Sequence, residues 1–245
     1  MELKLMKFKI NLFIAGLLLV SNTLSAQPVI SINTTGDPPL NTPEQSGFMD
    51  IISREAFKRI GYTLETVKLP AERGLRNTNA GVEDGEMSRI KGMEKLYPNL
   101  IRVPEKIMDW KFVVFSQNPI NLDKGWSSLS NKNLTYINGW KILEKNIPAS
   151  ASITRSRSAK QMFILFDKQR IDYIVYELWG GLLLSKSLNL KHLKLQHPPL
   201  ATREMFIYLH KKHKNLVPKL AEALKQMKQD GQYDEIKNKI LKPLE

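Results

Sequence analysis

Strand-like and helix-like segments alternate along this chain, and their order limits the folds that it can adopt. Residues 29–34, VISINT, alternate apolar and polar side chains as a half-buried strand does. Apolar residues then recur at helical spacing over 48–60 and end at Gly61, a residue common just after a helix. YTLETVKLP predicts a second strand, and 71–79 predicts a second helix after Pro70. Because parallel strands need a crossover connection, this order predicts a mainly parallel sheet with helices on its faces.

The alternation returns in the second half of the chain. An apolar run at 110–116, WKFVVFS, predicts a buried strand, and a turn-rich segment follows it. Further strands are predicted at LTYIN, 152–154, RIDYIVYE, HLKLQ and 205–209, with helices at WKILEKN, 156–169 and LWGGLLLSKSL and a helical tail up to Gly231. We therefore expect an α/β fold with two lobes, and small ligands are usually held between such lobes.

The first 26 residues have the composition of a secretory signal peptide. Three lysines form a positive segment, and the apolar run 10–20 is shorter than the roughly 20 residues that a membrane span needs. We expect cleavage after Ser25 or Ala26. No cysteine follows the apolar run, and no later segment is apolar enough to span a bilayer. The sequence thus predicts an exported, periplasmic protein without a membrane span after cleavage.

Charge and cysteine content narrow the function classes. The chain carries 37 Lys and Arg against 24 Asp and Glu, a net charge of +13, and loss of residues 1–26 would leave +11 on 219 residues. In an exported protein such a charge favours anionic solutes or envelope polyanions over nucleic acid, and the lysines are scattered as on a solvated surface. The chain has no cysteine, so no disulfide stabilises the fold. We expect no nucleic-acid partner.

Several segments in a fixed order resemble a known family. They are DPPL after the first strand, GFMDIISREAFKRIG, LPAERGL before GVEDGEMSRI, FVVFS, LSNKNLTYING, DKQRIDYIVYE, and MFIYLHKKH with the helical tail. Together they resemble the periplasmic solute-binding proteins of the amino-acid type, family 3. The resemblance implies a two-lobed periplasmic-binding-protein fold of type II, each lobe a mixed, mainly parallel sheet flanked by helices. It places lobe 1 at 27–116 and 205–245 and lobe 2 at 117–204, joined by two hinge strands at these limits.

The resemblance also implies a function. It is the binding of a small solute between the lobes, an amino acid or another small zwitterion or anion, for delivery to an ABC importer or a sensor in the membrane. We expect a monomer without cofactor, metal or catalytic residues. One alternative is a dehydratase on the same scaffold, with Glu83, Asp84, Glu86 and Glu177 supplying acid and base. Another alternative is an interaction protein that binds no solute.

The segment GVEDGEMSRIKG places Arg89 among acidic residues and glycines. In the family an arginine after the corresponding segment clamps the α-carboxylate of an amino acid, because a guanidinium offers parallel N–H donors to two oxygens. Arg89 lies closer to Asp84 than is usual in the family, so Arg73 of LPAERGL is a second candidate. A salt bridge to Glu83, Asp84 or Glu86 is the structural alternative for both arginines.

Lobe 2 supplies three further candidates. RIDYIVYE resembles the family strand whose final acid, here Glu177, holds the amino group of the ligand; such an acid can instead stabilise the start of a helix. Where the family has a Gly-Thr pair that binds the carboxylate, this chain has Gly139 and Trp140, so the backbone amides remain and the hydroxyl is lost. Trp140 can pack on an apolar, aromatic or cationic solute, or belong to the core of lobe 2.

Other chemistry has weak support in the sequence. His210 and His213 in HKKH have a spacing close to that of metal ligands, but lysines flank them without a neighbouring acid, so we expect a solvated turn. The sequence has no cysteine nucleophile, no GxSxG and no glycine-rich phosphate loop after a strand. Dinucleotide cofactors are therefore not expected.

Overall fold

The computed structural model describes residues 27–245, so the predicted signal peptide lies outside the described residues. The strands are β1 Val29–Thr34, β2 Thr63–Lys68, β3 Gly85–Ile90, β4 Leu100–Ser116, β5 Asn133–Ile137, β6 Ser152–Ser156, β7 Tyr173–Glu177 and β8 Lys194–His210. The α-helices are α1 Phe48–Arg59, α2 Ala71–Ala80, α3 Lys141–Asn146, α4 Ala159–Asp167, α5 Leu178–Ser187, α6 Val217–Gln229 and α7 Gln232–Ile240. The predicted strand at 29–34 and helix at 48–60 agree with β1 and α1.

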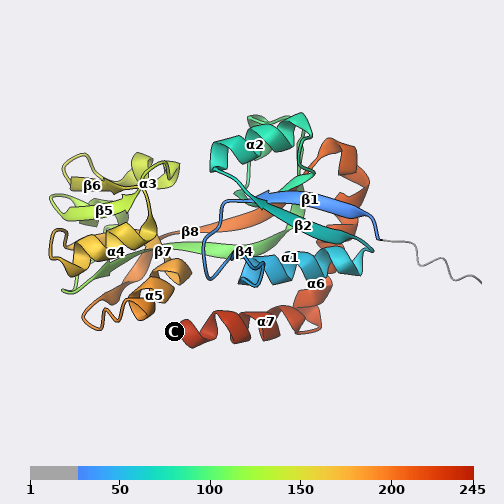
Figure 1. Cartoon of the computed structure of the whole chain (residues 1–245). Helices are drawn as coiled ribbons and strands as arrows, with labels where there is room; N and C mark the ends of the chain where they lie inside the picture. Colours follow the sequence, from blue (N-terminus) through green and yellow to red (C-terminus); the bar gives the residue numbers. More distant parts are fainter. Residues whose placement is uncertain (1–26) are drawn as a thin grey trace, which may run out of the picture.

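All the strands belong to one mixed sheet that extends through two lobes (Figure 1). Their order is β2-β1-β3-β8-β4-β7-β5-β6. The outer strands of each half pair in parallel, β1 with β2 and β3, and β5 with β6 and β7. The central pairs β3–β8, β8–β4 and β4–β7 are antiparallel. This arrangement confirms the predicted α/β fold with two lobes joined by two strands.

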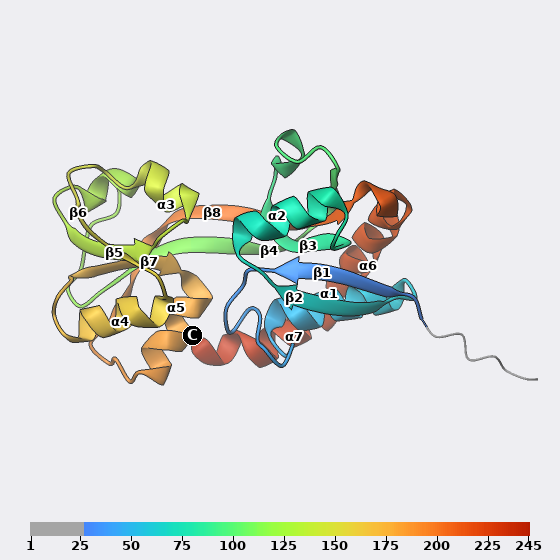
Figure 2. The ribbon, with the colours of Figure 1, turned by 45° about the horizontal axis from the view of Figure 1, so that its top comes forward.

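The two joining strands, β4 and β8, are longer than the sequence pattern predicts. They pair from Leu100 opposite His210 to Ser116 opposite Lys194 and pass through both lobes (Figure 2). The pattern predicted only 110–116 for β4 and two separate strands within β8. Those two strands are continuous because the proline-containing segment between them is accommodated at a register shift opposite Phe112 and Val114. Since neither strand breaks between the lobes, the lobe limits at 116 and 205 stay a prediction.

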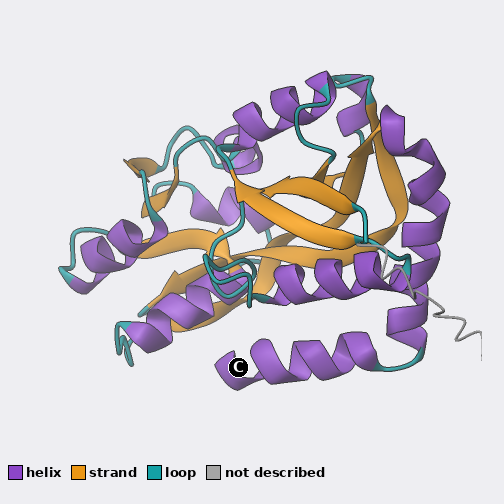
Figure 3. Ribbon diagram, turned by 45° about the vertical axis from the view of Figure 1, so that its right-hand side comes forward, coloured by secondary structure: helices purple, strands orange, loops and turns teal. Residues whose placement is uncertain are grey.

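Helices cover both faces of the sheet in each lobe (Figure 3). In lobe 1, α1 and α6 pack on one face with residues such as Ile52 and Leu224, and α2 covers the other face with Leu75. In lobe 2, alternate residues of β4 enter different cores: Phe115 packs in the core that includes residues of α4 and α5, and Phe112 in the core that includes α3. This alternation is the period-two pattern of a strand buried on both faces.

The C-terminal segment contacts both lobes. The hydroxyl of Tyr233 in α7 donates to the carbonyl oxygen of Ile107 (2.9 Å), and Lys186 of α5 in lobe 2 donates to the carbonyl oxygen of Pro243 (2.9 Å). Helix α7 runs along the side of the molecule opposite to α2 and α3 (Figure 1). Within residues 27–245, no helix combines the length and apolar character that crossing a bilayer requires.

Helix α5 approaches β4 closely at Gly181, and this contact gives a first prediction. A methyl group at Gly181 would lie 2.2 Å from ring carbons of Phe115. We expect Gly181→Ala to lower the free energy of unfolding by about 1–3 kcal/mol, since a well-packed core must shift to accept it. Thermal and urea denaturation would measure the loss, with Ser185→Ala in the same helix as the control. A Gly181→Ala variant as stable as the parent would contradict this packing.

Candidate ligand-binding site

Parts of both lobes face each other beside the joining strands. Helices α2 of lobe 1 and α3 of lobe 2 lie on the same side of β4 and β8 (Figures 1 and 2). Two electrostatic effects cross between the lobes. The pKa of Lys141 in α3 is raised mainly by its hydrogen bond with Glu144, and the charge of Glu72 in α2 adds to this. Burial raises the pKa of Tyr176 in β7, and the charge of Asp37 from the loop after β1 raises it further. We call this part of the molecule the interlobe region.

Arg89 lies in β3 on the lobe 1 side, and most of its hydrogen-bonding capacity is used within the protein. Its side chain is 12% exposed. Nη2 donates to Oε1 of Glu86 (2.7 Å) and to the carbonyl oxygen of Ala71 (3.0 Å), and Nη1 donates to Oγ1 of Thr35 (3.4 Å). Nε is buried and has no partner among the described residues. The salt bridge with Glu86 that the sequence analysis considered is therefore present, and the buried Nε–H donor remains without an acceptor.

Glu86 is buried between β1, β3 and α2. A Cβ at Gly74 of α2 would lie 2.6 Å from Oε1 of Glu86 and 2.3 Å from Oδ1 of Asn33, so α2 can approach this closely only with glycine there. Oε2 of Glu86 and Oδ1 of Asn33 have no partner within residues 27–245. Burial raises the pKa of Glu86 to about 7, although the nearby charge of Arg89 acts to lower it.

Arg73, the second candidate clamp, is exposed on the first turn of α2. It makes no ion pair with any residue that the structure describes. Its neighbour Glu72 pairs with Arg76 (3.0 Å) and accepts from the hydroxyl of Tyr97 (3.1 Å). Because the charge of Glu72 also acts on Lys141, this turn of α2 lies near lobe 2.

Four aromatic side chains, Trp110, Phe112, Trp140 and Tyr176, form what we call the aromatic cluster. Trp140 links them: its ring stacks on Tyr176 (5.2 Å between centroids, 20° between planes) and lies 5.9 Å from both Trp110 and Phe112. Phe112 and Tyr176 are buried, whereas Trp110 and Trp140 are partly exposed. Nε1 of Trp110 is buried without a partner in the described part of the chain. Trp140 borders both the core and the solvent. Its position is thus compatible with contact with a solute and with membership of the lobe 2 core.

Gly139 precedes this cluster in a turn that favours glycine. Its φ of 88° is in the left-handed region, which side chains with a Cβ rarely adopt. Its N–H donates to Oε1 of Glu144 (2.9 Å), so this amide already has an acceptor inside the protein. The turn therefore positions Trp140 at the start of α3.

Glu177 stands at the start of α5, where both its oxygens accept hydrogen bonds. Oε1 accepts from the backbone N–H of Trp179 (3.0 Å) and Oε2 from that of Gly180 (2.8 Å). The residue is 3% exposed. Burial raises its pKa to about 7, while the two backbone hydrogen bonds act to lower it. This geometry is that of a helix N-cap, the structural alternative considered from the sequence.

The other acidic residues proposed for catalysis also have structural partners. Asp84 contacts Nζ of Lys212 and Nε2 of His213 (both 2.7 Å), and it accepts from the backbone N–H of Ser31 (2.9 Å). Glu83 accepts from Asn77 (3.2 Å). The HKKH segment thus has an acidic neighbour, but it comes from a distant part of the sequence. Among residues 27–245 no group of three or more acidic, histidine or cysteine side chains is arranged to hold a metal ion.

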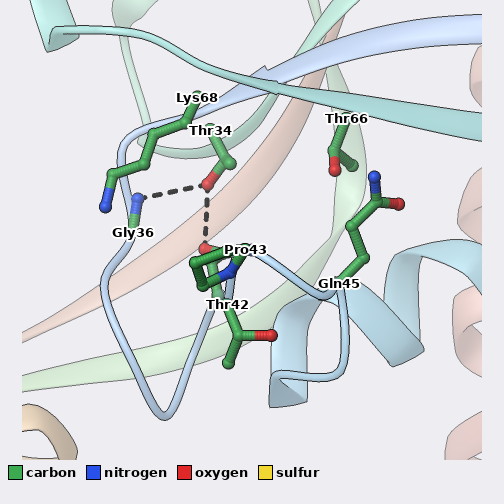
Figure 4. Close-up of a pocket in the computed structure, with 8 residues that line it drawn as sticks. Thr34, Gly36, Thr42, Pro43, Gln45, Thr66 and Lys68 are labelled. Carbon is green, nitrogen blue, oxygen red and sulfur yellow. Dashed lines mark hydrogen bonds between the residues drawn. The ribbon is translucent and has the colours of Figure 1, made fainter.

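A small polar hollow of about 100 Å³ lies at the ends of β1 and β2 (Figure 4). Its lining includes Thr34, Gly36, Gln45 and Lys68. The hydroxyl of Thr34 donates to Oδ1 of Asn41 (2.8 Å) and accepts from the N–H of Gly36 (3.1 Å), so these polar groups are satisfied within the protein. A wider surface hollow of about 510 Å³ lies between α1 and α6, away from the interlobe region.

The comparisons with known proteins agree with this architecture. No protein-family model matches the chain. A protein of Shewanella oneidensis without an assigned function is 28% identical over 197 residues, covering 77% of this chain and 74% of the relative. The GluR0 ligand-binding core in complex with L-glutamate has a TM-score of 0.75 at 11% identity, covering 89% of this chain and 99% of that one. The substrate-binding protein of an amino acid ABC transporter has a TM-score of 0.68 at 20% identity, covering 87% and 99%.

The chain has the two-lobed fold of the family 3 solute-binding proteins. The fold predicted from the resemblance is therefore confirmed. The roles of Arg73, Arg89, Gly139, Trp140 and Glu177 in binding stay a prediction.

The sequence analysis missed Trp110 and Tyr176 as members of the aromatic cluster. Both lie beside residues that it did consider, Trp110 at the start of the apolar run of β4 and Tyr176 directly before Glu177. For Tyr176 the available signal was a large aromatic residue near the carboxyl end of a strand, where α/β folds usually bind ligands, whereas Trp110 lies in the middle of β4.

Proposed function

We propose that this protein is exported to the periplasm and binds a small solute in a cleft between its two lobes. The observation that supports this most is the position of Arg73 in α2 of lobe 1 and of Trp140 at the start of α3 of lobe 2, two helices on the same side of the joining strands (Figure 1). Arg89 and Arg73 supply N–H donors, and Trp140, positioned by Gly139, supplies a ring face. The lobes would close on the solute by bending of β4 and β8 where these two strands pass between the lobes.

The closed form would then be recognised by a membrane partner, either an ABC importer or a sensor. Glu177 contributes to this proposal as the N-cap that fixes the start of α5 beside the aromatic cluster. Catalysis has less support, because Glu83, Asp84, Glu86 and Glu177 each have a separate structural partner.

A thermal-shift screen tests the binding function directly. A ligand that binds only the folded protein at 100 times its Kd stabilises it by about 2.7 kcal/mol, which corresponds to roughly 5–10 °C in Tm for a chain of this size. We expect such a shift for at least one compound in a panel of amino acids, polyamines and organic acids. If no compound changes Tm, the alternative of an interaction protein that binds no solute is favoured.

Tryptophan fluorescence locates the binding site. Because Trp140 and Trp110 are partly exposed in the interlobe region, we expect the solute found in the screen to change their emission. Trp140→Phe should remove most of the change and weaken binding by up to about tenfold, because the smaller ring keeps only part of the contact. The matched control is Trp126→Phe, because Trp126 packs on the same lobe 2 core as Phe112 but is not a member of the aromatic cluster. Loss of the signal in the control and not in Trp140→Phe would place the site elsewhere.

A further inference from the structure

Helix α5 of lobe 2 has no polar face in its first two turns. Its sequence there, LWGGLLL, is apolar without interruption. A helix of this kind needs cover on all sides, whereas a surface helix keeps one polar face. Strands β4 and β7 and helix α4 contact α5. A further contact comes from the short helix η4 Lys242–Leu244 at the end of the chain, which follows α7. Helix α5 thus receives part of its cover from outside lobe 2.

The segment that leads to η4 is held on lobe 1. The ring of Tyr233 in α7 packs edge-on against Phe48 of α1 (5.4 Å between centroids), and its hydroxyl donates to the carbonyl oxygen of Ile107 in β4 (2.9 Å). Near the end of α6, Nζ of Lys228 donates to the carbonyl oxygen of Lys106, also in β4 (2.6 Å). These contacts fix the start of α7 on α1 and on one of the joining strands, and its other end points toward lobe 2 (Figure 1).

Residues 241–245 cross from α7 to lobe 2, and we call them the C-terminal strap. Leu241 at its start is 1% exposed and belongs to a hydrophobic core cluster that includes residues of α1, α4 and α5. Nζ of Lys186, near the end of α5, donates to the carbonyl oxygen of Pro243 (2.9 Å). The C-terminus lies beside α5 in two views (Figures 1 and 2). The strap is therefore held by a buried side chain and by a hydrogen bond to lobe 2.

From these contacts we propose that the C-terminal strap limits the movement of the two lobes relative to each other. Strands β4 and β8 also join the lobes, and such a connection can bend. When it bends, α5 moves relative to α7, so the strap has to shift or to release α5. The strap contacts therefore stabilise the arrangement of the lobes in this structure over other arrangements. Such a restraint acts whether or not a solute is bound, so it goes beyond the proposed function.

Distances between spin labels on the two lobes test this role. The chain has no cysteine, so Lys58→Cys in α1 and Lys160→Cys in α4, both at exposed positions, give one label on each lobe. Pulsed EPR on the ligand-free protein then measures the distribution of distances between the labels. We expect Leu241→Ala, which loosens the strap from the core, to make the distribution about twice as wide as in the parent. Lys186→Met should widen it less, because an exposed lysine contributes little.

A matched core variant separates the strap from a general loss of stability. Leu224→Ala in α6 of lobe 1 also removes a fully buried leucine side chain. We expect it to lower Tm and to keep the parental distance distribution. Equal widening in Leu224→Ala, or no widening in both Leu241→Ala and Lys186→Met, would overturn the role of the strap. Because Lys186→Met leaves the core intact, it tests the strap even if Leu241→Ala does not fold.

Hydrogen exchange identifies the part of the protein that the strap restrains. Greater lobe movement opens the pairing of β4 with β8 more often, so the amide protons of residues 108–112 and 201–205 should exchange faster in Leu241→Ala. Those of α2, on the other side of the joining strands, should keep their parental rates. Faster exchange confined to α5 and the strap would show local loosening only and would overturn a limit on lobe movement. The thermal-shift screen for solutes is a separate measurement, so the strap and the proposed solute binding can each fail without the other.

Discussion

Replacing Arg89 by methionine is expected to lower the free energy of unfolding by about 3–5 kcal/mol at pH 8. Methionine fills part of the volume but leaves the buried carboxylate of Glu86 without its ion-pair partner. The loss should be smaller at pH 5, because Glu86 can then take up a proton and become neutral. Urea denaturation at the two pH values would measure both quantities.

The double variant Glu86→Gln/Arg89→Met separates the ion pair from simple packing. Gln removes the charge that Arg89 otherwise compensates, so we expect the double variant to recover more than half of the stability lost in Arg89→Met. If the stability losses of the two single variants instead add up in the double variant, Glu86 and Arg89 do not interact energetically. A single Arg89→Met variant with parental stability would contradict the buried pair itself.

Raising the pH from 5 to 8 is expected to destabilise the folded protein. Burial raises the pKa values of Glu86 and Glu177 from 4.5 to about 7, so between these values the folded state binds more protons than the unfolded state. Stability then falls as pH rises, with an upper limit of about 3 kcal/mol for each group. The carboxyls whose pKa values are lowered, Asp84, Glu94, Glu144 and Asp230, lose their protons below this window. The lowered pKa of the partly exposed His210, caused mainly by burial, opposes the trend weakly.

Charge-neutral variants identify the groups responsible. In Glu86→Gln and in Glu177→Gln the fall of Tm between pH 5 and 8 should become shallower, since each variant removes one of the titrating carboxyls. Glu65→Gln, at a residue of β2 with an exposed side chain, is the matched control and should retain the slope of the parent. A Tm that rises with pH over this range would show that neither carboxyl is protonated in the folded protein.

Local sequence patterns predicted the elements better than their pairing. The period-two pattern of β1 and the helical spacing of α1 arise from side chains only a few residues apart, and both were located correctly. The full length of β4 and β8 was not predicted, because prolines and charged residues such as Pro104 and Lys106 interrupt the local pattern that indicates a strand. Their strand conformation depends on pairing with each other, between residues as far apart in the sequence as Leu100 and His210.

In the candidate site, too, local contacts could be predicted from the sequence and the effects of burial could not. Glu177 caps the helix that follows it within three residues, and the sequence contained that alternative because the contact is local. Arg89 and Glu86 are also close in sequence, yet burial under Gly74 of α2 determines that they form a pair and shifts the pKa of Glu86.

By itself, the sequence determined the α/β order, the two lobes, the absence of disulfides and a short set of candidate residues, since these depend on composition and on near neighbours. Only the tertiary structure decided which acids are already engaged, which donors lack an acceptor, and that Trp140 stacks on Tyr176. Those properties depend on desolvation and on contacts between distant segments, and both arise only when the chain packs.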